Sequence, residues 1–182
     1  MEMAARTANS DWHSLFRSRR LGGPGEGCRL RIEYLADHVS HLPRLAEWHF
    51  AAFGYLNPAN TVERYVERLT AALQKSDLPT TFIALDDDSL LGSASLVRQT
   101  ITHPQLSPWL SSVYVDPPHR GKGIASALVE RVERAAAGMG WERIYLFTPS
   151  SEKLYASLGW ELMEYSHHGD TKIAIMSKRL GR

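Results

Sequence analysis

A basic turn that carries two glycines stands out as the part of this chain that could do chemistry. It follows the β-branched run Val113-Tyr-Val115 and an Asp-Pro-Pro break, and it reads Arg120-Gly-Lys122-Gly123 before a helical pattern begins. Glycines lack a Cβ and let the backbone approach a ligand closely. The first N–H groups of a helix have no intrahelical partner, and the helix dipole adds about half a positive charge there. Because Arg120 and Lys122 add full charges, the turn predicts a pyrophosphate site.

Two familiar nucleotide loops fit this turn poorly. A Walker loop needs a glycine five residues before the Gly-Lys pair and a hydroxyl residue after the lysine, but Asp116 and Gly123 hold those places. A dinucleotide fingerprint needs a glycine or alanine where Ser126 stands, and an acidic residue after the next strand, where the chain reads Leu146-Phe-Thr148-Pro149. ATP and NAD are therefore disfavoured as ligands.

The pattern Arg120-x-x-Gly123-x-Ala125 resembles the Arg/Gln-x-x-Gly-x-Gly/Ala signature of the GNAT superfamily, the GCN5-related N-acetyltransferases. The order of elements adds specificity, because a predicted strand at 143–148 follows the helix. The next segment, Lys153-Leu-Tyr-Ala-Ser-Leu-Gly-Trp160, is similar to the family's aromatic-Tyr-x-x-Leu-Gly-Phe element, with Leu154 and Trp160 in place of the usual aromatics. The resemblance covers roughly residues 29–180.

The resemblance implies that acetyl-CoA is the co-substrate and indicates which residues would bind its pantetheine arm and its pyrophosphate. The pantetheine arm would slot between two splayed parallel strands and bond to the backbone of the first. The residues so implied for cofactor binding are Val113, Tyr114 and Val115 for the arm, and Arg120, Gly121, Lys122, Gly123, Ile124, Ala125 and Ser126 for the pyrophosphate. The implied fold is α/β (α+β): a single domain with a central, mixed, mostly antiparallel sheet of six to seven strands, a splayed parallel pair, and about four helices on both faces.

Acetyl transfer from a thioester to an amine needs a neutral nucleophile, an oxyanion site and a proton for the departing thiolate. The resemblance places Tyr155 near the CoA sulfur, and this makes Tyr155 the candidate acid. Considered without the resemblance, a tyrosine in such a helix is more often a packed aromatic.

The proton acceptor is harder to assign. Many relatives carry a glutamate on the strand before the loop, but here that strand reads Trp109-Leu-Ser111-Ser112-Val113 and holds no carboxylate. We expect Ser111, Ser112 or the backbone to place a water that takes the proton, or an amine that arrives partly neutral. His103 and His119 titrate in a suitable range, although loop histidines are usually only solvated. Thr148-Pro149-Ser150 also departs from the family, since relatives often place an asparagine there to contact pantetheine.

The acceptor should be a primary amine of a small molecule or peptide, held by the first two helices, the turn between them and residues 100–109. The aromatic residues expected to form the walls of this cleft are Trp48, His49, Phe53, Tyr55, Trp109 and Tyr165. No acidic cluster marks a polyamine or aminoglycoside site, so those substrates are weakly disfavoured.

Hydrophobic periodicity predicts the elements that position these residues. Strands are expected at 29–35, 80–86, 90–98, 110–115, 143–148, 161–165 and 172–178, and helices at 43–53, from about 61, at 123–139 and at 151–158. Thr61 is the expected N-cap of the second helix. The third should bury Ala125, Leu128, Val132, Ala135 and Met139 and turn Glu130, Arg131, Glu133 and Arg134 to water.

Composition limits the remaining possibilities. The chain has 182 residues, 43% of them hydrophobic, a formal net charge of +1 and one cysteine. We expect a flexible extension at 1–27 and one acetyltransferase domain at 28–182, in the cytoplasm, with no nucleic-acid or membrane partner and no metal. A homodimer is compatible with the family. The leading interpretation is an acetyl-CoA-dependent N-acetyltransferase, and the alternative is a non-catalytic acyl-CoA-binding module.

Overall fold

The computed structural model describes residues 30–181, and its centre is a seven-stranded sheet in the order β1-β2-β3-β4-β5-β7-β6. Every neighbouring pair is antiparallel except β4 and β5, which run parallel. This is the mixed, mostly antiparallel sheet that the sequence predicts. The strands are β1 (Leu30–Tyr34), β2 (Thr80–Asp86), β3 (Ser89–Val97), β4 (Trp109–Val115), β5 (Arg143–Thr148), β6 (Glu161–His168) and β7 (Thr171–Arg179). The extension predicted at 1–27 lies outside the described residues.

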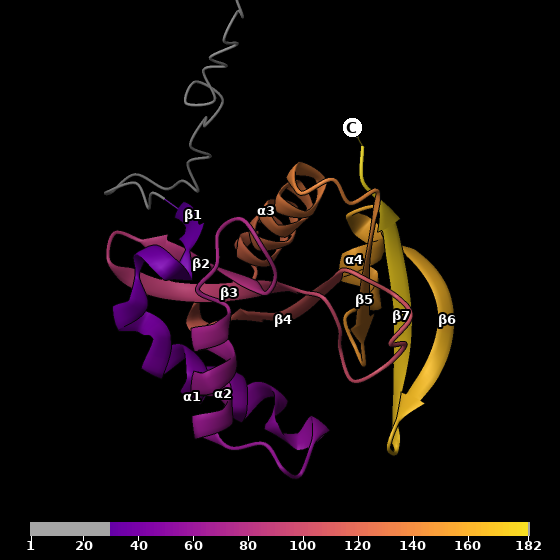
Figure 1. Ribbon diagram of the computed structural model, residues 1–182, viewed down its shortest axis with the longest axis horizontal. Coiled ribbons are helices and arrows are strands. Elements are labelled where there is room, and N and C mark those ends of the chain that lie inside the picture. Colours follow the sequence, from indigo (N-terminus) through magenta and orange to yellow (C-terminus); the bar gives the residue numbers. More distant parts are fainter. Residues whose placement is uncertain (1–29, 182) are drawn as a thin grey trace, which may run out of the picture.

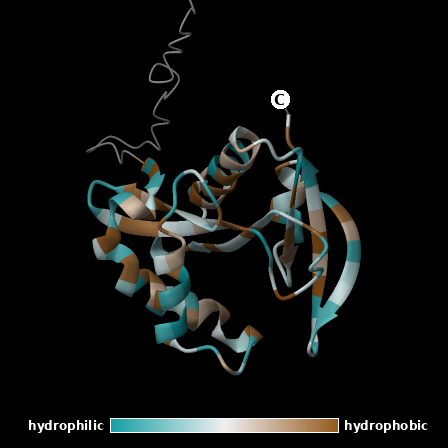
Figure 2. Ribbon diagram, in the orientation of Figure 1, coloured by the Kyte–Doolittle hydropathy of each residue, from teal (hydrophilic) through white to brown (hydrophobic). Residues whose placement is uncertain are grey.

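Helices cover both faces of the sheet (Figure 1). They are α1 (Leu42–Phe53), α2 (Val62–Ala71), α3 (Ile124–Gly138) and α4 (Glu152–Ser157). β2 alternates between two cores: Phe82 and Ala84 pack with α3, whereas Ile83 and Leu85 pack with α1 and α2. A strand buried on both sides reads as a continuous apolar run, which explains the sequence of β2. Figure 2 shows hydrophobic and hydrophilic stretches alternating along the helices, as expected for helices with one buried face.

Two helix predictions can be compared directly with the structure. The Thr61 side chain accepts a hydrogen bond from the backbone N–H of Arg64 at 3.3 Å, so the predicted N-cap of α2 is confirmed. In α3, Leu128, Val132 and Ala135 are buried as predicted, while Ala125 and Met139 are only partly buried.

The prediction that Glu133 and Arg131 face water is wrong. Glu133 accepts hydrogen bonds from the Trp160 indole at 2.8 Å and the Lys178 ammonium at 2.7 Å, and its side chain is only 12% exposed. The Arg131 guanidinium lies 4.1 Å from the centroid of the Phe82 ring. Periodicity missed both because a long side chain can lay its stem on apolar surface while its polar end finds a partner on another element.

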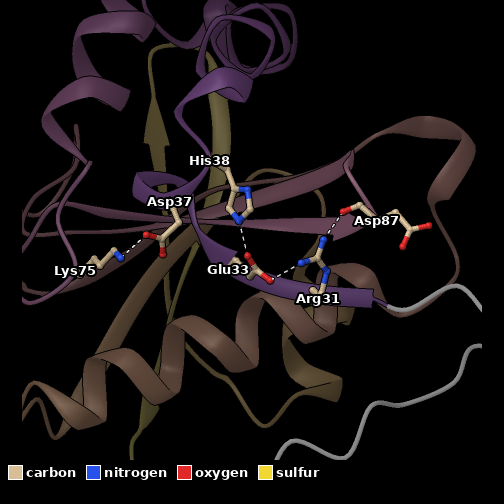
Figure 3. Close-up of polar contacts among 6 residues, drawn as sticks. All are labelled: Arg31, Glu33, Asp37, His38, Lys75 and Asp87. Carbon is tan, nitrogen blue, oxygen red and sulfur yellow. Dashed lines mark hydrogen bonds and ion pairs between the residues drawn. The ribbon is translucent and has the colours of Figure 1, made fainter. Parts of the chain in front are cut away.

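Polar contacts gather along β1, the strand at one edge of the sheet (Figure 3). Arg31 donates to Glu33 at 3.0 Å and to the carbonyl of Asp87 in the β2–β3 turn. Glu33 also contacts His38. These groups are a quarter or more exposed, so each ion pair contributes little, about 0–1 kcal/mol. The contacts join β1 to the β2–β3 turn and to His38, which precedes α1.

Candidate active site

The parallel strands β4 and β5 separate almost as soon as they meet. Within the described chain their register consists of the single pair Trp109 and Tyr145, joined by a 3.0 Å hydrogen bond from Tyr145 N–H to the Pro108 carbonyl. The backbone of β4 from Leu110 to Val115 therefore faces an opening where β5 would otherwise pair with it. A buried backbone group needs a hydrogen-bond partner, so this edge is suited to a ligand that carries amides.

β4 also contains a bulge. Ser93 of β3 pairs with Tyr114, while Ser95 pairs with Ser111, so β4 has one more residue than β3 over this stretch. Ser112 lies in the bulge and has φ +53°, a conformation that is uncommon outside glycine. Bulges re-aim side chains and often lie beside functional sites. Here the bulge brings the hydroxyl groups of Ser111 and Ser112 to 3.3 Å from each other.

The predicted phosphate loop ends in a helix N-terminus that has no side-chain cap. Gly123 is the N-cap of α3, and no side chain bonds to the first amides of the helix. Gly121 and Gly123 have φ +74° and +79°, which explains why both are glycine. A Cβ at either position would meet no protein atom within 4 Å, so the space beside them is open.

A cavity of about 560 Å³ lies over this loop and beside β4. All the residues predicted to bind the cofactor line it, except Lys122: they are Val113, Tyr114, Val115, Arg120, Gly121, Gly123, Ile124, Ala125 and Ser126. The structure thus brings two separate stretches of sequence to one wall. Arg120 is held there by a 2.9 Å hydrogen bond from its Nε to the Val115 carbonyl.

A second cavity, of about 740 Å³, adjoins the first and lies among α1, α2 and the ends of β4 and β5. We call it the acceptor cavity, because it lies where the sequence predicts that an acceptor would bind, and we call the first one the loop cavity. The residues that line both are Ala52, Phe53, Val113, Ser151 and Tyr155. Ser111 and Ser112 line the acceptor cavity only. The predicted catalytic residues therefore lie at or beside the place where the two cavities meet.

Tyr155 stands at this junction. It is 7% exposed, and burial raises the pKa of its phenol to about 12, so the hydroxyl is neutral at any physiological pH. Its ring contacts the Trp160 ring edge-on, with centroids 6.0 Å apart. Among the described residues its hydroxyl has no hydrogen-bond partner, so it is free to donate to a ligand.

His49 is an imidazole in the acceptor cavity that the sequence predicted only as a wall. It is 2% exposed, its Nε2 lies 2.8 Å from the Ser93 hydroxyl, and burial lowers its pKa to about 4. The ring is therefore neutral near pH 7. Of the two histidines weighed as bases, His103 contacts Glu164 at 2.9 Å and does not line either cavity, while His119 lines the loop cavity. The sequence signal that could have identified His49 as a buried, neutral imidazole is its position on the apolar face of an amphipathic helix.

The predicted aromatic walls are half right. His49, Phe53 and Tyr55 line the acceptor cavity. Trp109 does not: it is fully buried, and its indole donates to the Leu106 carbonyl at 2.7 Å. Tyr165 is 50% exposed on β6 and donates to Glu152.

Trp48 is also absent from the cavity lining. Trp48 and His49 are consecutive residues of α1, and successive side chains of a helix point about 100° apart around its axis. The Trp48 ring packs on Tyr114, with ring centroids 5.3 Å apart. The Arg44 guanidinium lies 5.1 Å from the centroid of the Trp48 ring.

Within residues 30–181, no group of three or more His, Cys, Asp or Glu side chains is placed to hold a metal ion. Over the same residues, no helix has both the length and the apolar character that crossing a membrane requires.

The family model described as "Acetyltransferase (GNAT) family" matches residues 42–160. The chain belongs to this family. The match covers α1, the loop cavity and Tyr155, so the resemblance inferred from the loop is confirmed. No curated protein sequence matches the chain significantly.

Solved structures share the fold. An aminoglycoside 6′-N-acetyltransferase in complex with coenzyme A has a TM-score of 0.67 at 17% identity, over 84% of this chain and 98% of that one. The yncA protein of Salmonella typhimurium, with its cofactor acetyl-CoA, has a TM-score of 0.66 at 17% identity, over 84% and 95%. N-acetylglutamate synthase from Neisseria gonorrhoeae, with coenzyme A and N-acetyl-glutamate, has 0.62 at 16%, over 84% and 35%. At these identities the likeness shows the fold alone.

Proposed function

We propose that this protein transfers an acetyl group from acetyl-CoA directly to a primary amine of a small molecule or peptide. The observation that carries the proposal is the meeting of two cavities at Tyr155, one built on an uncapped helix N-terminus and one lined by aromatic and hydroxyl groups. Membership of the acetyltransferase family supports it, as do fold relatives solved with coenzyme A or acetyl-CoA.

The residues of the loop cavity fit the co-substrate. The open amides at the start of α3, with Arg120 and Lys122 beside them, suit the pyrophosphate of coenzyme A. The unpaired edge of β4 from Val113 to Val115 suits the amides of pantetheine. In this arrangement the thioester comes to the junction with the acceptor cavity.

At the junction, a neutral amine attacks the thioester carbon, and the carbon–sulfur bond then breaks. Tyr155 donates a hydrogen bond to the departing sulfur, which leaves as a thiolate and takes its proton from solvent. Its pKa of about 12 keeps it in the donating form before the reaction. The proton released by the amine goes to a water that we place at Ser111 and Ser112, whose hydroxyl groups lie together in the bulge of β4.

The charge of the acceptor cavity indicates which chemical class of amine it could bind. One fold relative is an aminoglycoside 6′-N-acetyltransferase, and an aminoglycoside is a polycation that would call for acidic groups. Within the described chain, none of the residues that line the acceptor cavity is Asp or Glu. We therefore propose a different acceptor from the one named for that relative.

The second candidate function is a non-catalytic module that binds acyl-CoA, and the lack of a carboxylate on β4 and around the acceptor cavity favours it. Two measurements separate the candidates. Calorimetry should register binding of coenzyme A, and thiol release from acetyl-CoA should occur with at least one amine of a broad panel. Binding without turnover over the whole panel would support the module, and the absence of any heat would refute both candidates.

A further inference from the structure

The acceptor cavity carries an unbalanced positive charge. Its lining, within residues 30–181, includes two arginines, Arg68 and Arg98, and no carboxylate. His49 also lines it but is neutral near pH 7. The two arginines differ in whether another protein group neutralises them.

Arg98 is balanced. Its guanidinium forms an ion pair with the carboxylate of Asp77, which lies outside the cavity lining. The backbone N–H of Leu78, and then Arg98 itself, hold the pKa of Asp77 below its usual range, so this carboxylate stays charged. The pair therefore adds little net charge to the cavity.

Within residues 30–181, Arg68 has only neutral partners. Its guanidinium donates to the side-chain oxygen of Asn60 at 3.0 Å and lies 5.1 Å from the centroid of the Tyr65 ring. Asn60 in turn donates to the Gly54 carbonyl and the Tyr65 hydroxyl at 3.4 Å each. Burial raises the pKa of Tyr65, so its phenol does not supply a negative charge. Among the described ion pairs, none includes Arg68.

A continuous wall joins Arg68 to the junction of the two cavities. The Tyr65 ring lies 6.1 Å from His49, and His49 lies 5.8 Å from Phe53, one helical turn further along α1. Phe53 lines both cavities. A molecule lying along this wall would have one end at the thioester and the other at a guanidinium that still has free donors, the arrangement in which Arg binds carboxylates well.

We propose that the acceptor is a primary amine that also carries a carboxylate, with the amine at the Tyr155 junction and the carboxylate at Arg68. This rests on the proposed acetyl transfer. The aromatic wall of Phe53, His49 and Tyr65 suits an apolar body between the two charged ends. A polycation would be repelled by Arg68 and would find no acidic partner in the lining. An amide or a decarboxylated form of the same amine would lose its anchor.

The test compares acids with their own amides, which differ only in the carboxylate. Phenylalanine, 6-aminohexanoate and glycyl-phenylalanine cover three separations of amine and carboxylate, and spermidine and kanamycin serve as polycations. Thiol release from acetyl-CoA gives kcat/KM, and calorimetry with protein saturated with coenzyme A measures the same preference without turnover. We expect the acid of at least one pair to be favoured about tenfold or more, equal to about 1.4 kcal/mol.

Variants then assign the preference to one side chain. Arg68→Ala should abolish it and Arg68→Glu should reverse it, with the loss mainly in KM. Arg64→Ala is the matched control, because Arg64 is exposed one turn earlier on α2 and does not line the cavity. Arg68 is itself exposed, so its replacement should leave the melting temperature within a few degrees, which thermal melts would check.

The outcomes separate this inference from the proposed function. Amides or polycations that perform as well as the acids, in both turnover and binding, would overturn the inference. So would an acid preference that Arg68→Glu leaves intact. Acid-selective binding at Arg68 with no turnover for any amine would support the carboxylate site and refute acetyl transfer instead.

Discussion

Replacing Tyr155 with phenylalanine tests the chemistry at the junction of the two cavities. The change removes one hydroxyl and keeps the ring, which is 7% exposed and packs on Trp160. Because that hydroxyl has no partner among the described residues, the free energy of unfolding should change by less than about 0.5 kcal/mol. The loop cavity keeps its shape, so the Kd for coenzyme A should stay within about twofold.

The pKa of Tyr155 sets the size of the catalytic effect. Its value of about 12 exceeds that of an ordinary thiol, about 8.5, so complete transfer of the proton to a thiolate is uphill by about 3.5 pKa units. The phenol therefore helps mainly by donating a hydrogen bond to the negative charge that develops on sulfur. Removing one such donor typically costs a factor of about 10² to 10³, and we expect kcat to fall by that amount.

The assay is thiol release at saturating acetyl-CoA with an accepted amine. Tyr145→Phe is the control, since Tyr145 packs on Trp109 from β5 and does not line either cavity. Because Tyr155 stays protonated up to about pH 12, its removal should lower the rate by the same factor from pH 7 to 9.5. A turnover within twofold of the parent protein would remove Tyr155 from the mechanism.

Two further predictions concern the loop and His49. Gly123→Ala and Gly140→Ala place alanine at φ +79° and +85°, so each should cost about 1 kcal/mol of stability in urea unfolding. Only the first should weaken coenzyme A binding in calorimetry, because its Cβ projects into space where only a ligand could meet it; equal affinities would refute the loop assignment. His49 has its pKa lowered from 6.5 to about 4, so the folded protein binds this proton more weakly than the unfolded chain does. The stability that depends on it is complete above pH 6.5 and decreases by up to about 3 kcal/mol as the pH falls to 4. His49→Gln should flatten that part of the pH profile of urea unfolding, and parallel profiles would contradict it.

The sequence predicted the features that depend on neighbours along the chain. The antiparallel strand pair at 80–86 and 90–98, the Thr61 cap and the strand–turn–helix around Gly123 are local patterns, and the structure confirms them. The loop could be interpreted because backbone amides, glycines and cations that are adjacent in sequence form an anion site wherever the domain places them.

The sequence did not predict which side chains face the acceptor cavity. Trp109 and Tyr165 were expected there, but the cross-strand register puts one in the core and the other on an edge strand. Glu133 looked like a water-facing residue until β7 brought Lys178 to it.

What the sequence determined by itself was the family and the position of the glycine-bearing turn before α3, because both rest on short contiguous patterns. Only the tertiary structure decided that α1, α2 and β4 together enclose a cavity whose lining holds a neutral His49 and an Arg68 that forms no ion pair with the described residues. The physical reason is that burial and charge balance depend on residues far apart in the chain. The pKa of a histidine, or the net charge of a cavity, is defined only once the fold has chosen its neighbours.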